Sequence, residues 1–240
     1  MKSWDTKARN LEVRSILAPG LIVSCQAWQG TPLLSPEIMA AFALSAQRAG
    51  AVGIRANSPA HVAEMKRKGV TIPIIGIDKQ HYDGYQVYIT PTRREAEALA
   101  KAGADIIAID GTRRPRPDGE TLEAEVAYIQ GTLGIPVMLD VSNLEEALYG
   151  EELGVALIAT TLAGYTPYTE SSKTEGPDLE LLKQVVARVH CPVLGEGRFH
   201  KPEQVRQALA AGAYGVVVGT ALTDLEWRIR QFVPSGSQSS

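Results

Sequence analysis

Eight short runs rich in Val, Ile and Leu recur along this chain, and most are followed by a segment of helical character. Near-continuous apolar runs of this kind are typical of parallel strands whose two faces are both covered. Their alternation with helices predicts an α/β protein built on a parallel sheet. The runs are LIVSCQ (21–26), AVGIRA (51–56), IPIIGIDK (72–79), IIAID (106–110), IPVMLDVS (135–142), ALIATT (156–161), CPVLGEGR (191–198) and YGVVVGTALT (214–223).

The segments between these runs carry apolar residues at spacings of three and four, which indicates amphipathic helices. In three of them a glycine follows the periodic part and a strand begins soon afterwards. We expect these glycines, which are Gly50, Gly103 and Gly212, to adopt the left-handed conformation that ends a helix.

Eight strand–helix units with short connections favour a closed (β/α)8 TIM barrel. The alternative is a doubly wound open sheet, but the first strand–helix turn lacks the glycine fingerprint of that fold. The 240 residues fit one such barrel, and no linker interrupts them. We therefore expect a single catalytic domain over residues 1–233 and a disordered Ser/Gly-rich tail over 234–240.

Composition narrows the range of partners. A formal charge of −3 provides no basic field for nucleic acid or a membrane surface, and no apolar run is long enough to span a bilayer. The polar N-terminus is unlike a secretory signal. Cys25 and Cys191 are expected at opposite rims of the barrel, too far apart to form a disulfide. We expect a cytoplasmic protein with a small-molecule substrate, whereas the oligomeric state, a homodimer included, stays open.

Polar side chains gather where the predicted strands end, which is the rim that carries the active site in such barrels. Placing them among apolar neighbours is costly unless they have a partner or a purpose. They are Gln26, Arg55, Lys79, Asp110, Asp140, Thr160, Thr161, Glu196 and Arg198.

Lys79 and Glu196 are the candidate chemical centre. Side chains alternate along a strand, so an inward Lys79 implies inward Ile75 and Ile77, and an inward Glu196 implies an inward Leu194. Strands 3 and 7 face each other across an eight-stranded barrel, so both groups would approach one ligand from different sides. The competing interpretation is a buried structural ion pair.

The loops after strands 7 and 8 are candidates for a phosphate site. Gly197 and Gly219 would let backbone N–H groups approach an anion closely, and Arg198 and Thr220 would add donors. The alternative is that the glycines serve only turn geometry. The loop at 163–168 is interpreted equally as a lid or a rigid corner, and the Arg/Pro-rich loop at 112–119 is expected to be solvated.

A set of ordered motifs adds a resemblance. The chain resembles bacterial N-acetylmannosamine-6-phosphate 2-epimerases of sialic-acid catabolism from about residue 20 to about residue 230. The motifs are SCQA (24–27), GIRA (53–56), PIIGIDK (73–79), YITPT (88–92), IIAIDGT (106–112), TTLAGYTPY (160–168), GEGR (195–198) and VVVGTALT (216–223).

This resemblance implies a barrel isomerase that interconverts N-acetylmannosamine 6-phosphate and N-acetylglucosamine 6-phosphate. It assigns catalysis to Lys79 and Glu196. It further implies substrate contacts from Gln26, Arg55, Asp140 and Arg198, and phosphate binding by Gly197 and Gly219. The chain departs from the family pattern at Asp78, at LDVS (139–142) and at Thr220, and Asp78 stands directly beside the lysine.

The chemistry requires a base that reaches C2 and a group that stabilises charge on the carbonyl oxygen. Lys79 is expected to be the principal base, acting either with Glu196 on the opposite face or alone with a substrate hydroxyl as relay. We expect no metal and no organic cofactor, since the four histidines show no paired ligand spacing. A Schiff-base lyase and a non-catalytic sugar-phosphate-binding barrel remain the alternatives.

Overall fold

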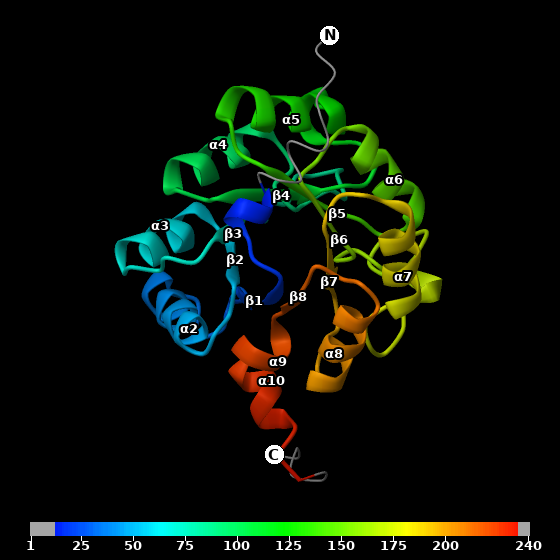
Figure 1. Ribbon diagram of the computed structural model, residues 1–240. Helices are drawn as coiled ribbons and strands as arrows, with labels where there is room; N and C mark the ends of the chain where they lie inside the picture. Colours follow the sequence, from blue (N-terminus) through cyan, green and yellow to red (C-terminus); the bar gives the residue numbers. More distant parts are fainter. Residues whose placement is uncertain (1–12, 235–240) are drawn as a thin grey trace.

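The computed structural model describes residues 13–234. Within this range eight parallel strands close into a barrel in sequence order, with β8 paired to β1. Helices surround the barrel (Figure 1). The (β/α)8 prediction is therefore confirmed, whereas nearly all of the predicted tail lies outside the described residues.

The strands are short, and each is shorter than or equal to its predicted run. They are β1 (Gly20–Cys25), β2 (Gly53–Asn57), β3 (Ile74–Ile77), β4 (Ile106–Asp110), β5 (Val137–Asp140), β6 (Leu157–Ala159), β7 (Val193–Glu196) and β8 (Gly215–Val218). The α-helices are α2 (Pro36–Arg48), α3 (Pro59–Arg67), α4 (Arg93–Ala102), α5 (Leu122–Tyr128), α6 (Leu144–Glu152), α7 (Leu179–Arg188), α8 (Pro202–Ala210), α9 (Thr220–Thr223) and α10 (Leu225–Arg230).

Two apolar clusters follow from the alternation of side chains along the strands. One fills the barrel and includes Ile75, Ile77 and Leu194, as expected from the predicted inward register. The other lies between the strands and the helices and includes the neighbouring residues Ile74 and Val193. This packing leaves the positions above the inner cluster for polar side chains.

Helix ends follow local sequence chemistry. Gly50, Gly103 and Gly212 all have positive φ, at 95°, 93° and 95°, which confirms the predicted helix stops. At the opposite ends, side-chain oxygens accept hydrogen bonds from first-turn N–H groups, as with Thr92 at α4 and Asn143 at α6. Short-range signals therefore set most element boundaries.

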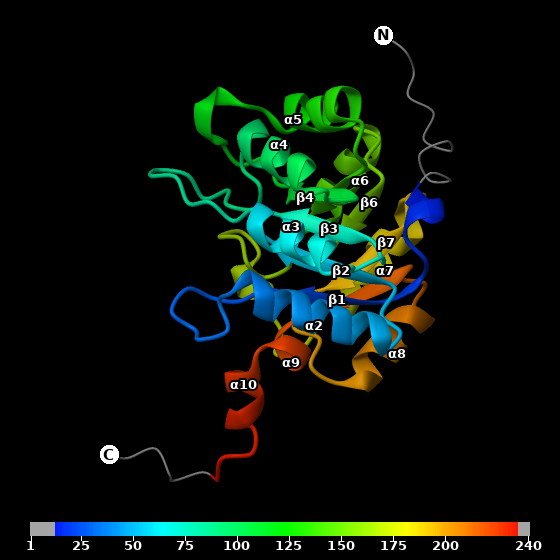
Figure 2. The same cartoon turned by 90° about the vertical axis from the view of Figure 1, so that its left-hand side faces the viewer.

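β8 ends at Val218, so Gly219 follows the strand as expected, and the later residues of the run 214–223 form the short helix α9. α10 follows and projects away from the barrel in both views (Figures 1 and 2). Among residues 13–234 no helix has the length and apolar character needed to cross a bilayer. Cys25 and Cys191 are both buried free thiols, as expected.

Candidate active site

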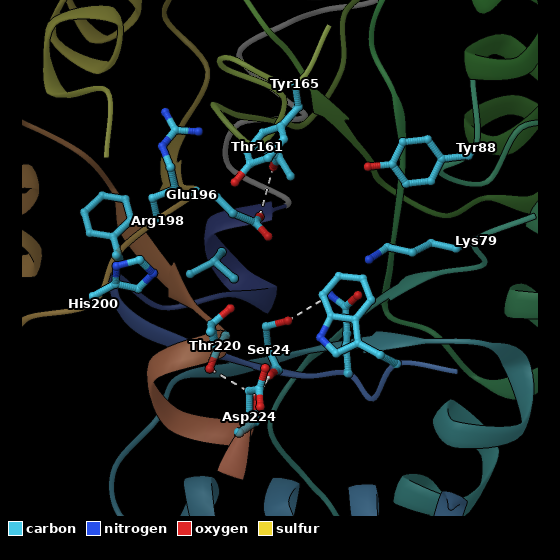
Figure 3. Close-up of a pocket in the computed structure, with 17 residues that line it drawn as sticks. Ser24, Lys79, Tyr88, Thr161, Tyr165, Glu196, Arg198, His200, Thr220 and Asp224 are labelled. Atoms are coloured by element: carbon cyan, nitrogen blue, oxygen red, sulfur yellow. Dashed lines mark hydrogen bonds between the residues drawn. The ribbon is translucent and has the colours of Figure 1, made fainter. Parts of the chain in front are cut away.

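A pocket of about 220 Å³ lies at the carboxyl ends of the strands, where the barrel fold places active sites. Lys79 and Glu196 line it from opposite sides (Figure 3). The structure thus brings together two residues that are 117 positions apart. The other predicted site residues that line this pocket are Gln26, Gly197, Arg198, Gly219 and Thr220.

Lys79 stands just beyond β3 and is held by its backbone. Its N–H donates to Asn57 Oδ1 at 3.0 Å, and it forms an antiparallel bridge with Ile89. Its Nζ lies 4.9 Å from the centre of the Trp28 ring. Burial and the positive charge of Arg55 lower the pKa of Lys79 to about 8, against the opposing effect of Glu196 and Asp140. A substantial neutral fraction is therefore available near neutral pH.

Asp78, the unusual neighbour of the lysine, faces away from it. Its carboxylate accepts a hydrogen bond from Gln80 at 2.9 Å, and burial raises its pKa. The groups that shift the pKa of Lys79 are Arg55, Glu196 and Asp140, all on other strands. The expected outward direction of Asp78 agrees with these contacts.

Glu196 belongs to a buried network that joins strands β2, β5 and β7. Arg55 forms ion pairs with both Asp140 and Glu196. Thr161 Oγ1 donates to Asp140 at 2.5 Å or to Glu196 at 3.1 Å. Burial raises the pKa of Glu196 to about 7, while Arg55 opposes that rise and Asp140 adds to it. Glu196 is therefore able to carry a proton near neutral pH.

Arg55 and Asp140 were expected to contact substrate, but the structure places them behind Glu196. Their side chains are 1% and 0% exposed, and neither lines the pocket. Arg55 pairs with both carboxylates, Asp140 and Glu196, and Asp140 also accepts a hydrogen bond from Thr161. The geometry therefore fits a role in orienting Glu196 better than a direct substrate contact.

The turns after β7 and β8, where the sequence predicts a phosphate site, line one part of the pocket. Gly197 has a φ of +106°, which favours glycine. Gly219 packs so tightly that an added Cβ would lie 3.2 Å from the Cβ of Ser24. Thr220 begins α9 on the same wall, and His200 lines the pocket nearby (Figure 3). Burial and Arg198 lower the pKa of His200.

Arg198 lines the pocket, but its N–H groups bind the loop after β6. Its Nε donates to the carbonyl of Gly176 at 2.8 Å, and its Nη1 donates to that of Ala163 at 2.7 Å. The guanidinium also lies 5.2 Å from the centre of the Tyr165 ring, which itself lines the pocket. Arg198 therefore tethers the loop that follows β6 over the site.

The loop at 112–119, expected to be solvated instead of in contact with ligand, is exposed in part and does not line the active-site pocket. Arg114 pairs with Asp110 at 2.8 Å, and Arg116 pairs with Glu125 at 2.9 Å with both side chains buried. Burial raises the pKa of Glu125 to about 8 in spite of Arg116. Charge pairing with strand and helix carboxylates therefore buries part of the loop, a contact that composition does not reveal.

Several residues that line the pocket are not among the site residues predicted from the sequence. Thr161, Tyr88 and Trp28 are three of them, and the sequence marks Thr161 only as a polar strand end. A signal existed for two of them, because Tyr88 opens the YITPT motif and Trp28 follows SCQA by one residue. Across residues 13–234 no three His, Cys, Asp or Glu side chains are grouped as metal ligands would be.

Comparison with known proteins gives a consistent result. The family model described as "Putative N-acetylmannosamine-6-phosphate epimerase" matches residues 39–237. A protein from Caldanaerobacter subterraneus subsp. tengcongensis with the name "Putative N-acetylmannosamine-6-phosphate 2-epimerase" is 46% identical over 224 residues, 93% of each chain. One of the same name from Cutibacterium acnes is 44% identical over 209 residues, covering 86% of this chain and 89% of that protein.

Solved structures agree with the sequence relatives. The structure of the N-acetylmannosamine-6-phosphate 2-epimerase from Clostridium perfringens superposes with a TM-score of 0.86 at 41% identity. The match covers 92% of this chain and 94% of that chain. By its sequence, its barrel and its strand-end residues, the chain belongs to the N-acetylmannosamine-6-phosphate 2-epimerase family.

Proposed function

We propose that this protein is an isomerase that interconverts N-acetylmannosamine 6-phosphate and N-acetylglucosamine 6-phosphate in sialic-acid catabolism. The observation that carries the proposal is the pairing of Lys79 and Glu196 across one pocket, with pKa values of about 8 and about 7. Catalytic groups work best when their pKa lies near the operating pH. Membership of the family supports the choice of substrate.

The reaction exchanges the proton on C2 of the open-chain sugar. This proton is acidic because C2 is adjacent to the C1 aldehyde, so its removal gives an enolate. In the proposed mechanism neutral Lys79 removes the proton from one face, and protonated Glu196 returns one to the other face. In the reverse direction the two groups exchange roles. Their positions on opposite sides of the pocket support this two-face transfer (Figure 3).

The remaining pocket residues hold the substrate. Gly197, Gly219 and Thr220 are proposed to bind the phosphate, because glycine backbones expose N–H groups to an anion and Thr220 adds a hydroxyl. Gln26 is proposed as a contact to the sugar, and its amide also donates to Ser24 Oγ at 2.8 Å. No step in this scheme calls for a metal or an organic cofactor. Its buried free thiols suit the cytoplasm, where we propose the protein acts.

A proton-NMR assay in D₂O tests the proposal directly. We expect the purified protein to convert N-acetylmannosamine 6-phosphate to the gluco epimer and to introduce deuterium at C2 of both sugars. Lys79→Ala should lower kcat by about 100-fold or more, which is the usual worth of a general base. Turnover without deuterium at C2 would exclude C2 proton exchange with solvent. Borohydride trapping of the sugar on Lys79 would favour the Schiff-base lyase.

A further inference from the structure

The end of the pocket beyond Lys79 carries two aromatic side chains to which the proposed mechanism assigns no role. Trp28 lies in the connection between β1 and α2, and Tyr88 precedes α4. Both line the pocket close to Lys79: Lys79 Nζ lies 4.9 Å from the centre of the Trp28 ring, and Tyr88 lies next to Lys79 in Figure 3. The question is which part of a sugar phosphate would meet them.

The Tyr88 hydroxyl points into the open pocket (Figure 3). Its ring is fixed by stacking on His81, with centroids 5.3 Å apart and planes inclined by 13°. No described residue between 13 and 234 forms a hydrogen bond with this hydroxyl. Burial and the nearby Asp140 and Asp110 raise the pKa of Tyr88, so its hydroxyl keeps its proton. Tyr88 thus offers a fixed hydrogen-bond donor to whatever occupies this end.

Trp28 supplies an apolar surface in the same pocket, next to Lys79. Its side chain is 61% exposed, and the face of its ring meets Lys79 Nζ at 4.9 Å from the ring centre. An exposed indole face attracts apolar groups such as a methyl, and it also attracts cations. The Trp28 ring and the Tyr88 hydroxyl are themselves uncharged, so the contacts they offer a ligand are an apolar ring face and one O–H donor.

The geometry of the sugar then selects the group that reaches this end, an argument that rests on the proposed function. Phosphate at Thr220 and C2 at Lys79 leave C1 and the C2 substituent to lie beyond the lysine. We infer that Trp28 and Tyr88 form a subsite for the C2 acylamino group. Tyr88 donates to the amide carbonyl oxygen, and the Trp28 ring packs against the acyl methyl. A neutral acylamino group matches these two contacts, because its carbonyl oxygen accepts from the Tyr88 hydroxyl and its methyl group suits the apolar face of Trp28.

Binding measurements with matched ligands test the subsite. N-acetylglucosamine 6-phosphate and glucose 6-phosphate share the phosphate and the carbon chain, but only the first has an acyl group. We expect wild-type protein to bind the acylated ligand more tightly. Tyr88→Phe should reduce this preference by about 3- to 10-fold, which is the usual contribution of one hydrogen bond. Trp28→Ala should reduce it by about 3-fold or more, from loss of a methyl contact.

Controls separate the subsite from general effects. Tyr85 lies on the same connection between β3 and α4, is 39% exposed and does not line the pocket. Tyr85→Phe should therefore leave the preference unchanged. The affinity for glucose 6-phosphate should stay within about twofold in both test variants. Equal weakening of both ligands would overturn the inference and place the two aromatics on the shared carbon chain.

The same measurements distinguish this inference from the proposed function. If wild-type protein does not epimerise N-acetylmannosamine 6-phosphate, the proposed function fails, whereas the ratio of the two dissociation constants still reports on the subsite. If the protein epimerises this sugar but Tyr88→Phe and Trp28→Ala leave the ratio at its wild-type value, the inference alone fails. Both variants are expected to fold, since the first keeps the aromatic ring and the second changes an exposed side chain.

Discussion

Two side chains of opposite charge have pKa values only about one unit apart, because burial acts on them in opposite directions. Burial disfavours the charged form of each, so the pKa of Lys79 falls to about 8 and that of Glu196 rises to about 7. Arg55 adds to the first shift and opposes the second. Proton exchange between the two groups through a substrate therefore costs little free energy.

This pairing predicts a bell-shaped pH profile of kcat/KM. Lys79 becomes neutral as the pH rises through about 8, and Glu196 loses its proton as the pH rises through about 7. A reaction that needs neutral lysine and protonated glutamate therefore has its maximal rate between about pH 7 and pH 8. The two apparent pKa values of the profile describe the pair of groups and not either residue alone. Initial rates measured by NMR across pH 5–10 check this.

Glu196→Gln separates the two limbs. Glutamine does not ionise, so the fall in rate at alkaline pH should disappear, while the rise with pH that depends on Lys79 should remain. The maximal rate should drop by about 100-fold or more if Glu196 transfers a proton. A variant that keeps both the wild-type rate and the wild-type profile would show that Lys79 works without Glu196.

Arg55 is paired with two buried carboxylates, Asp140 and Glu196. Arg55→Met should lower the free energy of unfolding by about 3–5 kcal/mol at pH 8, since it leaves buried charge unpaired. Burial already raises the folded-state pKa of Glu196 to about 7, and without Arg55 that pKa rises further. The loss of stability should therefore shrink as the pH falls through this raised pKa and Glu196 becomes protonated.

Urea denaturation at pH 8 and pH 5 measures this difference. Thr161→Val is a milder comparison in the same network, because it removes hydrogen bonds to Asp140 and Glu196 but no charge. We expect it to cost about 1–3 kcal/mol. An Arg55→Met variant as stable as wild type at pH 8 would contradict the buried-network interpretation.

At the scale of elements, the loop between β6 and α7 depends on one side chain of the next strand–helix connection. Arg198 holds the carbonyls of Ala163 and Gly176, so it joins both ends of this loop to the turn after β7. The loop places Tyr165 against the pocket. The interpretation of the loop as a tethered cover follows from these contacts.

Removing the tether should loosen the loop without unfolding the barrel. In Arg198→Ala we expect amide hydrogen exchange over 163–176 to quicken by roughly 10- to 100-fold, from the loss of two charge-assisted hydrogen bonds. Arg198→Lys should keep only part of the slow amide exchange over 163–176, because one ammonium lacks the forked donors that reach two carbonyls. Exchange rates equal to wild type in Arg198→Ala would exclude the tether.

Backbone strain provides an internal comparison at the same position. Arg198 has a φ of 57°, a left-handed conformation that glycine adopts without a Cβ penalty. Arg198→Gly and Arg198→Ala both lose the tether, but the glycine variant should be more stable by about 1 kcal/mol. Thermal unfolding of the two variants side by side measures this difference.

For the whole molecule, a group of exposed apolar side chains lies on and just after α10, which projects from the barrel (Figures 1 and 2). Leu225, Ile229 and Phe232 on and just after this helix are 50%, 52% and 78% exposed. Clustered exposed apolar side chains commonly mark an interface between chains. The homodimer left open by the sequence gains support from this surface.

Sedimentation velocity at micromolar concentration tests this association. We expect a dimer for wild type and a shift toward monomer for Ile229→Asp with Phe232→Asp, because buried unpaired charge weakens an apolar interface. Tyr85→Asp, which changes an exposed apolar side chain away from α10, should remain dimeric. A monomeric wild-type protein would contradict the prediction.

The sequence by itself determined the features that depend on neighbours along the chain. Alternation within a strand predicted that Ile75 and Ile77 fill the barrel below Lys79, and helix-stop glycines such as Gly103 were recognisable because only local backbone conformation is involved. The position of Gly219 after strand 8 was recognisable for the same reason, since β8 ends at Val218.

Only the tertiary structure decided which strand-end side chains face the ligand and which face one another. Arg55 lies 85 positions from Asp140 and 141 from Glu196, and their ion pairs form only when the barrel closes. Arg198 likewise lines the pocket, but its N–H groups donate hydrogen bonds to loop carbonyls. The physical reason is that burial and charge pairing depend on distance in space, whereas the sequence records only order along the chain.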